Sequence, residues 1–289
     1  MDLVVQSAKL AVETCDAFKV AMLAEPPLRH ERAARLRGVD DDAFSRRVAG
    51  ALAAYWRCDA NFVRPGLRTG DFRVLVMDMD STAITIECID ELARMAGQGE
   101  AVAAITAAAM RGEIADYAES LRRRVALLAG APAALLQRVA VERLRYSDGV
   151  RRLLQEARRL GWSTLLVSGG FTYFAEQVGR ELGFDAVRAN DLVVHEGSLS
   201  GEVTGPREYD GRILDAAGKA RMLQQLCGHA GCGTDRALAI GDGANDLQMM
   251  AAAGLSIAYR AKPLVRQHAT CSLEHTPLDG VLELFEDCW

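Results

Sequence analysis

Acidic residues follow two short apolar runs of the sequence, and their spacing suits the binding of a cation. Asp78 and Asp80 stand two residues apart after the first run, while Asp242, Asn245 and Asp246 follow the second. If both runs are strands of one parallel sheet, their carboxyl ends share an edge, and the four carboxylates meet there. Like charges at such short range repel strongly unless a cation lies among them.

Oxygen ligands of this kind are those that a hard divalent ion prefers, and the sequence predicts Mg²⁺. A simpler explanation exists for the first pair, because Asp80 or Ser81 could cap a following helix. The second cluster is harder to explain in that way, since Gly241 and Gly243 account for a sharp turn but not for two further acids. We therefore expect the two clusters to form one site.

A hydroxyl and two glycines stand at the end of another apolar run. Ser168, Gly169 and Gly170 precede a segment with helical spacing. Free amides at a helix N-terminus favour an anion such as phosphate, although a strand-to-helix turn that needs glycine is the alternative explanation. Lys219 lies in a predicted helix over 215–226, where a lysine is ordinarily solvated. It matters here because the acidic cluster needs a compensating positive charge.

The elements that must position these residues follow a strand-then-helix rhythm from about residue 72. The apolar runs that begin each repeat are 74–77, 164–167, 237–240 and 255–258. Strands that are apolar throughout are buried on both faces, as in α/β proteins. The sequence therefore predicts an α/β fold with a doubly wound, mostly parallel sheet and a hairpin turn at Glu196-Gly197 on one edge.

Two regions depart from this rhythm. Residues 85–146 show no credible strand and are expected to form a helical cap, inserted after the first core strand. The catalytic α/β core would then comprise residues 71–84 and 147–289. Residues 1–70 are expected to be mostly helical, with a helix within 33–56, and they carry no assigned role.

Composition excludes several classes of protein. The chain has 289 residues, is 50% hydrophobic and carries a formal net charge of -5, which disfavours nucleic acid as a partner. Its apolar stretches are too short to span a membrane, and its start does not read as a signal peptide. Seven scattered cysteines form no disulfide framework, so we expect a cytoplasmic protein. A homodimer is left open.

Four motifs in this order resemble those of the haloacid dehalogenase-like hydrolases, and within them the phosphoserine phosphatases. The motifs are 78–82, 168–170, Lys219 and 241–246, and the further matches to the phosphoserine phosphatases are 86–91, 120–125, 167–171 and 258–263. The resemblance covers about residues 72–289. Many relatives carry an amino-acid-binding βαββαβ module before this region. Residues 1–70 show no clear set of strands, so that module is not expected here.

The resemblance implies an Mg²⁺-dependent phosphomonoesterase that hydrolyses the small molecule O-phosphoserine, the last step of serine biosynthesis. Asp78 would be the nucleophile that forms an aspartyl-phosphate, and Asp80 would act as general acid and then as general base. The Asp78 carboxylate, the Asp80 main-chain carbonyl and Asp242 would hold the metal, with Asp246 behind them. The groups that would bind or position the phosphoryl oxygens are Ser168, Gly169, Lys219 and Asn245.

The cap would supply substrate specificity. By resemblance, Glu87 takes the substrate ammonium, Arg124 takes its carboxylate, and Met110 and Tyr117 line the pocket, although the family more often has phenylalanine at the position of Tyr117. Helical spacing places Arg124 at the edge of an apolar stripe, in agreement with this role. The same spacing places Glu87 opposite the apolar face of its helix, so the pattern alone predicts a solvated acid.

Other functions remain to be weighed against hydrolysis. A phosphotransferase of the same fold, which passes the phosphoryl group to homoserine or another alcohol, is not separated from a phosphatase by sequence. A non-catalytic phospho-accepting regulator is disfavoured, because Asp80 would hydrolyse the acyl phosphate that such a protein must keep. A dehalogenase is disfavoured too, because it needs neither Asp80 nor a metal.

Overall fold

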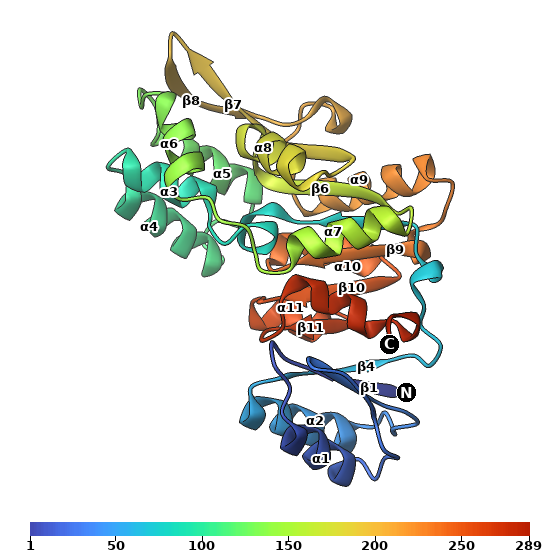
Figure 1. Ribbon diagram of the computed structural model, residues 1–289. Helices are drawn as coiled ribbons and strands as arrows, with labels where there is room; N and C mark the ends of the chain where they lie inside the picture. Colours follow the sequence, from blue (N-terminus) through green and yellow to red (C-terminus); the bar gives the residue numbers. More distant parts are fainter.

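Short apolar strands form the larger of two sheets, as the sequence predicts. The computed structural model describes residues 1–289, and seven of its strands pair in the order β11-β10-β9-β5-β6-β7-β8 (Figure 1). These strands are β5 (Val74–Met77), β6 (Ser163–Phe171), β7 (Ala186–His195), β8 (Ser198–Thr204), β9 (Ala237–Gly241), β10 (Leu255–Tyr259) and β11 (Cys271–Leu273). All neighbours are parallel except β7 and β8, which form the predicted antiparallel hairpin. The predicted α/β class is confirmed.

Alternate residues of the central strands point to opposite faces of this sheet. Leu75 and Met77 of β5 pack into one hydrophobic cluster, whereas Val74 and Val76 pack into another. Two helices cover the first face, α7 (Val150–Arg159) and α8 (Thr172–Leu182), and three cover the second, α9 (Ala216–His229), α10 (Leu247–Ala252) and α11 (Pro263–His268). No helix is long and apolar enough to cross a bilayer.

Four helices are inserted between β5 and α7, and we call them the cap. They are α3 (Cys88–Met95), α4 (Gly99–Met110), α5 (Tyr117–Ala126) and α6 (Ala134–Glu142). The two connections to the core lie side by side, because Ile84 forms a β-bridge with Tyr146 and the Thr85 amide donates to the Arg145 carbonyl at 2.9 Å. The chain therefore leaves the core and returns to it at the same place.

Residues 1–70 differ from the prediction of a mostly helical segment. They form a four-stranded antiparallel sheet in the order β2-β3-β1-β4, covered by two helices. In chain order the elements are β1 (Asp2–Gln6), α1 (Val12–Ala21), β2 (Leu28–Arg29), β3 (Ala33–Leu36), α2 (Ala43–Trp56) and β4 (Asp59–Val63). This is the βαββαβ order, which was not expected here. We call this part the N-terminal module.

Burial explains why the sequence pattern did not predict the strands of the N-terminal module. All four residues of β3 are buried, including Arg35, so the strand shows no alternation of polar and apolar residues. The expected helix within 33–56 begins only at Ala43, where the Asp42 side chain caps it by accepting from the Ser45 amide at 2.7 Å. Alanine, arginine and leucine favour helices locally, but pairing with β1 decides the structure of β3.

The two sheets meet edge to edge, where β4 of the N-terminal module lies beside β11 of the core (Figure 1). The Asn61 side chain accepts from the Ser272 amide at 2.7 Å and donates to the Ser272 carbonyl at 3.0 Å. The Asp59 carboxylate, which is buried, accepts from the three successive amides of residues 274–276 and from the Thr276 hydroxyl. Side chains of β4 thus satisfy main-chain groups of β11 and of the segment that follows it, at an edge that would otherwise be open to aggregation.

The Asp59 contact gives a test of how firmly the N-terminal module is docked. Asp59→Ala should lower the free energy of unfolding by roughly 2–4 kcal/mol, because several backbone donors lose their acceptor together. Urea unfolding would measure this loss, with Asp40→Ala as the control, since Asp40 is exposed and its side chain makes no hydrogen bond. Equal stability of the two variants would show that the sheet-to-sheet contact contributes little.

Candidate active site

The first acidic pair lies in a wide turn directly after β5. The Asp78 side chain accepts from the Met79 amide at 2.7 Å, and the Ile84 amide closes the turn by donating to the Met79 carbonyl at 3.0 Å. Ser81 within this turn has a φ of +56°, a left-handed conformation that reverses the chain toward the cap. As a result, the carboxylates of Asp78 and Asp80 both line one cavity.

The second acidic cluster lies in the turn after β9, the strand that pairs with β5. One oxygen of Asp246 accepts from the Asp242 amide at 3.2 Å and from the Gly243 amide at 3.0 Å, so this side chain shapes the turn. Only glycine fits at position 241, because a Cβ there would collide with the Asp246 carboxylate. The turn places Asp242 and Asn245 at the cavity and Asp246 behind it.

Lys219 is completely buried, although a lysine in a helix is ordinarily exposed to solvent. Its Nζ lies 2.7 Å from Asp78 Oδ1 and 2.7 Å from Asp246 Oδ1, so it joins the two acidic clusters from beneath. Burial alone would lower the pKa of Lys219, but the two carboxylates reverse that effect and raise it above the usual value. Lys219 is therefore a permanent positive charge at the edge of the sheet.

Three buried carboxylates, those of Asp78, Asp242 and Asp246, could hold a metal ion. One oxygen of each lies within 4.8 Å of the others. Burial raises the pKa of Asp78 well above its usual range, and the charge of Asp246 adds to this effect. Burial and Asp246 likewise raise the pKa of Asp242 to about 6. This excess of negative charge over one lysine, together with an all-oxygen donor set, fits a hard divalent cation.

The segment at the end of β6 contributes the predicted hydroxyl and glycines. The Ser168 hydroxyl accepts from the Gly170 amide at 2.9 Å and donates to Asp80 Oδ2 at 3.2 Å, while the Cys88 amide donates to Asp80 Oδ1 at 2.9 Å. Burial nevertheless raises the pKa of Asp80 above its usual value, so its carboxyl group can carry a proton. Gly170 has no room for a side chain, because a Cβ would meet the Asp80 carboxylate.

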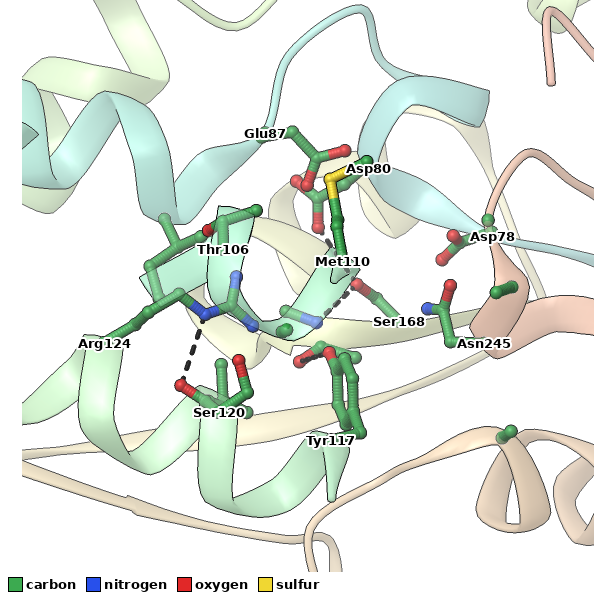
Figure 2. A pocket seen from close by; sticks show the side chains of 18 of the residues that line it. Asp78, Asp80, Glu87, Thr106, Met110, Tyr117, Ser120, Arg124, Ser168 and Asn245 are labelled. Atoms are coloured by element: carbon green, nitrogen blue, oxygen red, sulfur yellow. Dashed lines mark hydrogen bonds between the residues drawn. The ribbon is translucent and has the colours of Figure 1, made fainter. Parts of the chain in front are cut away.

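The cap closes the other side of a cavity of about 610 Å³, a volume typical of small-molecule sites. Arg124 of α5 points into it and forms no ion pair, since its only hydrogen bond runs from Nε to the Ser120 carbonyl at 3.3 Å (Figure 2). Met110 and Tyr117 contribute to the same wall. An arginine without a carboxylate partner in a cavity is suited to an anionic group of a ligand.

Glu87 also faces the cavity, contrary to what its helical position predicts. It is the N-cap residue of α3, and its Oε1 accepts from the Ser81 hydroxyl at 2.7 Å. The residue as a whole is exposed, but its carboxylate lies at the cavity beside Asp80 (Figure 2). Loss of water there and the charge of Asp80 raise the pKa of Glu87 to about 7. The helical pattern failed because Glu87 precedes the helix rather than lying on its outer face.

Most of the predicted site residues therefore converge on one cavity. Those that line it are Asp78, Asp80, Glu87, Met110, Tyr117, Arg124, Ser168, Gly169, Asp242 and Asn245. Lys219 and Asp246 lie buried behind this lining and contact it through Asp78 and the turn after β9.

Two further residues at the site were not predicted. Lys262 lines the cavity, and its charge opposes the rise in the pKa of Asp242. Residues 168–171 at the end of β6, where its pairing with β7 is irregular, are called the Ser168 loop below. Buried Asn190 of β7 donates to the Gly169 carbonyl at 2.8 Å and accepts from the Leu214 amide at 2.7 Å, which ties the Ser168 loop to the segment before α9. Lys262 falls within a motif of the resemblance, but no signal in the sequence indicates the role of Asn190.

Comparisons with known proteins agree with this geometry. The model of the haloacid dehalogenase-like hydrolase family matches residues 75–251. A phosphoserine phosphatase of Polaromonas sp. is 49% identical over 224 residues, which are 78% of this chain and 94% of the relative. One of Albidiferax ferrireducens is 47% identical over 77% of this chain and 93% of its own. The unliganded crystal structure of a probable phosphoserine phosphatase from Vibrio cholerae has a TM-score of 0.81, with 32% identity over 99% of this chain and 87% of that one.

The raised pKa values predict how a divalent cation competes with protons at this site. A carboxylate must lose its proton to bind the ion, so Mg²⁺ affinity should fall about tenfold per pH unit for each proton that must be displaced below pH 6. Calorimetric titration between pH 5 and 8 would measure this dependence. Asp242→Ala should weaken Mg²⁺ binding, whereas Asp191→Ala, an exposed acid of β7, should not. Equal affinity for Mg²⁺ at pH 5 and 8 would contradict the assignment of these carboxylates as metal ligands.

Proposed function

The chain belongs to the haloacid dehalogenase-like hydrolases, and we propose that it hydrolyses O-phosphoserine to serine and phosphate. The observation that carries this proposal is the distribution of charge in the cavity. The acids of the two strand ends occupy one side, and an unpaired Arg124 with Glu87 occupies the cap side. Phosphoserine carries its phosphate at one end and a carboxylate and an ammonium at the other, in the same arrangement.

We infer that Asp78 is the nucleophile. Its Oδ1 is fixed by Lys219 and by the Met79 amide, both at 2.7 Å, while its Oδ2 accepts no hydrogen bond. We infer that Oδ2 attacks phosphorus, so that a bond to Asp78 forms as the bond to the serine oxygen breaks. Water then attacks the aspartyl-phosphate, which releases phosphate and restores the carboxylate.

We infer that Asp80 moves the protons of both steps. With its pKa raised by burial, the Asp80 carboxyl group can deliver a proton to the departing serine oxygen. The resulting carboxylate can then take a proton from the attacking water. Hydrogen bonds from the Cys88 amide and the Ser168 hydroxyl hold the two oxygens of this group in place through both steps.

The phosphate end needs more positive charge than the protein supplies. A dianionic phosphate about 4 Å from a carboxylate meets a repulsion on the order of 8 kcal/mol at an effective dielectric constant near 20. Lys219 is already shared between two carboxylates, so it cannot offset this alone. We propose that Mg²⁺, when bound, supplies the missing charge and is held by the Asp78 carboxylate, the Asp80 main-chain carbonyl and Asp242. Asp246 already accepts from Lys219 and two amides, which supports a place behind the ligands.

The remaining groups would orient the substrate. Ser168, the amide of Gly169 and Asn245 lie on the phosphate side of the cavity and can contact phosphoryl oxygens. Arg124 can form two parallel hydrogen bonds to the substrate carboxylate, and Glu87 can accept from its ammonium. Met110 and Tyr117 would close the cavity over the bound serine.

The division of labour between the two acids can be tested by near-isosteric changes. Asp78→Asn should abolish the acid-stable radiolabelled phosphoenzyme that forms with labelled phosphoserine. Asp80→Asn should slow turnover, and the loss should be greater with phosphoserine than with p-nitrophenyl phosphate, whose phenolate departs without a proton. Near-normal turnover by Asp78→Asn would place the nucleophile elsewhere.

Substrate choice is tested by removing the charges of the cap. Arg124→Ala should reduce kcat/KM for phosphoserine by roughly 2–4 kcal/mol of transition-state stabilisation, and Glu87→Ala by roughly 1–3 kcal/mol. The activity with p-nitrophenyl phosphate, which offers neither an ammonium nor a carboxylate, should change far less.

The matched control for this experiment is Arg123→Ala, one residue along the same helix. Arg123 points to solvent and pairs with Glu119 at 2.7 Å, so its loss should leave both substrates unaffected. Equal losses on both substrates in the Arg124 and Glu87 variants would exclude a role in specificity.

A further inference from the structure

The carbonyl of Gly169 receives two hydrogen bonds, one from the core and one from the cap. Asn190 of β7 donates its side-chain amide at 2.8 Å, and the Tyr117 hydroxyl of α5 donates at 3.0 Å. A carbonyl oxygen has two lone pairs, so this acceptor is fully used. In Figure 2 the Tyr117 ring extends from the start of α5 toward the core, below the Ser168 side chain.

The contact between Tyr117 and Gly169 is built into the fold of both segments. A Cβ at position 169 would collide with the Tyr117 hydroxyl, so the hydroxyl occupies space that only glycine leaves free. It is also the only hydrogen bond between the cap and residues 168–171. Burial raises the pKa of Tyr117 to about 12, which keeps the hydroxyl protonated and able to donate at every working pH.

The peptide that accepts from Tyr117 leads directly to the catalytic groups. The same peptide unit carries the Gly170 N–H, which donates to the Ser168 hydroxyl at 2.9 Å. That hydroxyl must then direct its own proton elsewhere, and it donates to Asp80 Oδ2 at 3.2 Å. Hydrogen bonds in such a chain polarise and align one another. The orientation of Ser168 therefore depends on what holds the Gly169 carbonyl.

We propose that Tyr117 is a positioning residue whose hydroxyl holds the cap against the Ser168 loop and so aligns the Ser168 hydroxyl for the reaction. The proposal rests on the function proposed above. Asn190 supplies a permanent donor from the core, whereas the donor from the cap is present only when α5 lies against the loop. Closure of the cavity and alignment of Ser168 then become one event.

Tyr117→Phe tests this directly, because it removes the hydroxyl and keeps the ring that packs in the cap. Hydrogen exchange of the full chain, without substrate or metal, should show several-fold faster exchange in peptides that contain residues 168–172. The control is Tyr55→Phe, since Tyr55 is 78% exposed and lies in the N-terminal module. Exchange of residues 168–172 at the wild-type rate in Tyr117→Phe would overturn the proposal, whatever the effect on catalysis.

Steady-state kinetics with phosphoserine supply the second measurement. In this proposal the hydroxyl does not touch the substrate, so kcat should fall roughly fivefold, the effect of one hydrogen bond, while KM changes by less than about twofold. A rise in KM at unchanged kcat would overturn the proposal, because it would make the hydroxyl a substrate contact. Failure of the wild-type protein to hydrolyse phosphoserine would refute the proposed function but leave the exchange comparison decisive for the contact.

Discussion

The site is organised by one buried lysine, Lys219, which lies between two acidic turns. Lys219 contacts Asp78 from the turn after β5 and Asp246 from the turn after β9, each at 2.7 Å. Without it, two neighbouring strands would bring uncompensated carboxylates to one edge of the sheet, at a large cost in free energy. The lysine also distinguishes the two oxygens of Asp78, because it contacts Oδ1, whereas Oδ2 accepts no hydrogen bond. The position of α9 on the sheet is thus a condition for the chemistry.

The core and its site were predictable because their constraints are local or follow from the topology. Parallel strands end at a common edge, so the acids after β5 and β9 had to meet once both runs were identified as strands. The strands of the N-terminal module were not predictable in this way. Arg35 of β3 is buried against Asp2 and the Leu284 carbonyl, and no local pattern reveals partners so far apart in the chain.

Two residues at the site, Glu87 and Asn190, also have roles that the sequence pattern could not predict. The helical pattern alone predicted a solvated Glu87, and only the resemblance assigned it to the pocket, since helical periodicity does not apply to an N-cap residue whose direction is set by the preceding turn. Asn190 was not predicted at all. Its side chain satisfies main-chain groups of Gly169 and Leu214, and the hydrogen bonds that main-chain groups need cannot be recognised in a pattern of polar and apolar residues. The residues proposed to react could be identified from the sequence, whereas those that hold the backbone in place could be identified only from the fold.

The edge-to-edge contact of the two sheets has a consequence for biosynthesis. Translation proceeds from the N-terminus, so β1 to β4 can complete their own sheet while the rest of the chain is still being made. Strand β5 is synthesised next, but both of its partners, β6 and β9, follow the cap in the chain. The apolar residues of β5 therefore stay unpaired until these later strands have been made. The edge of β4 waits longest, because β11 follows all the other strands of the two sheets in chain order. A nascent chain that pauses between these events exposes the unpaired apolar strand β5 and the open edge of β4 at the same time. A molecular chaperone would matter most in this interval.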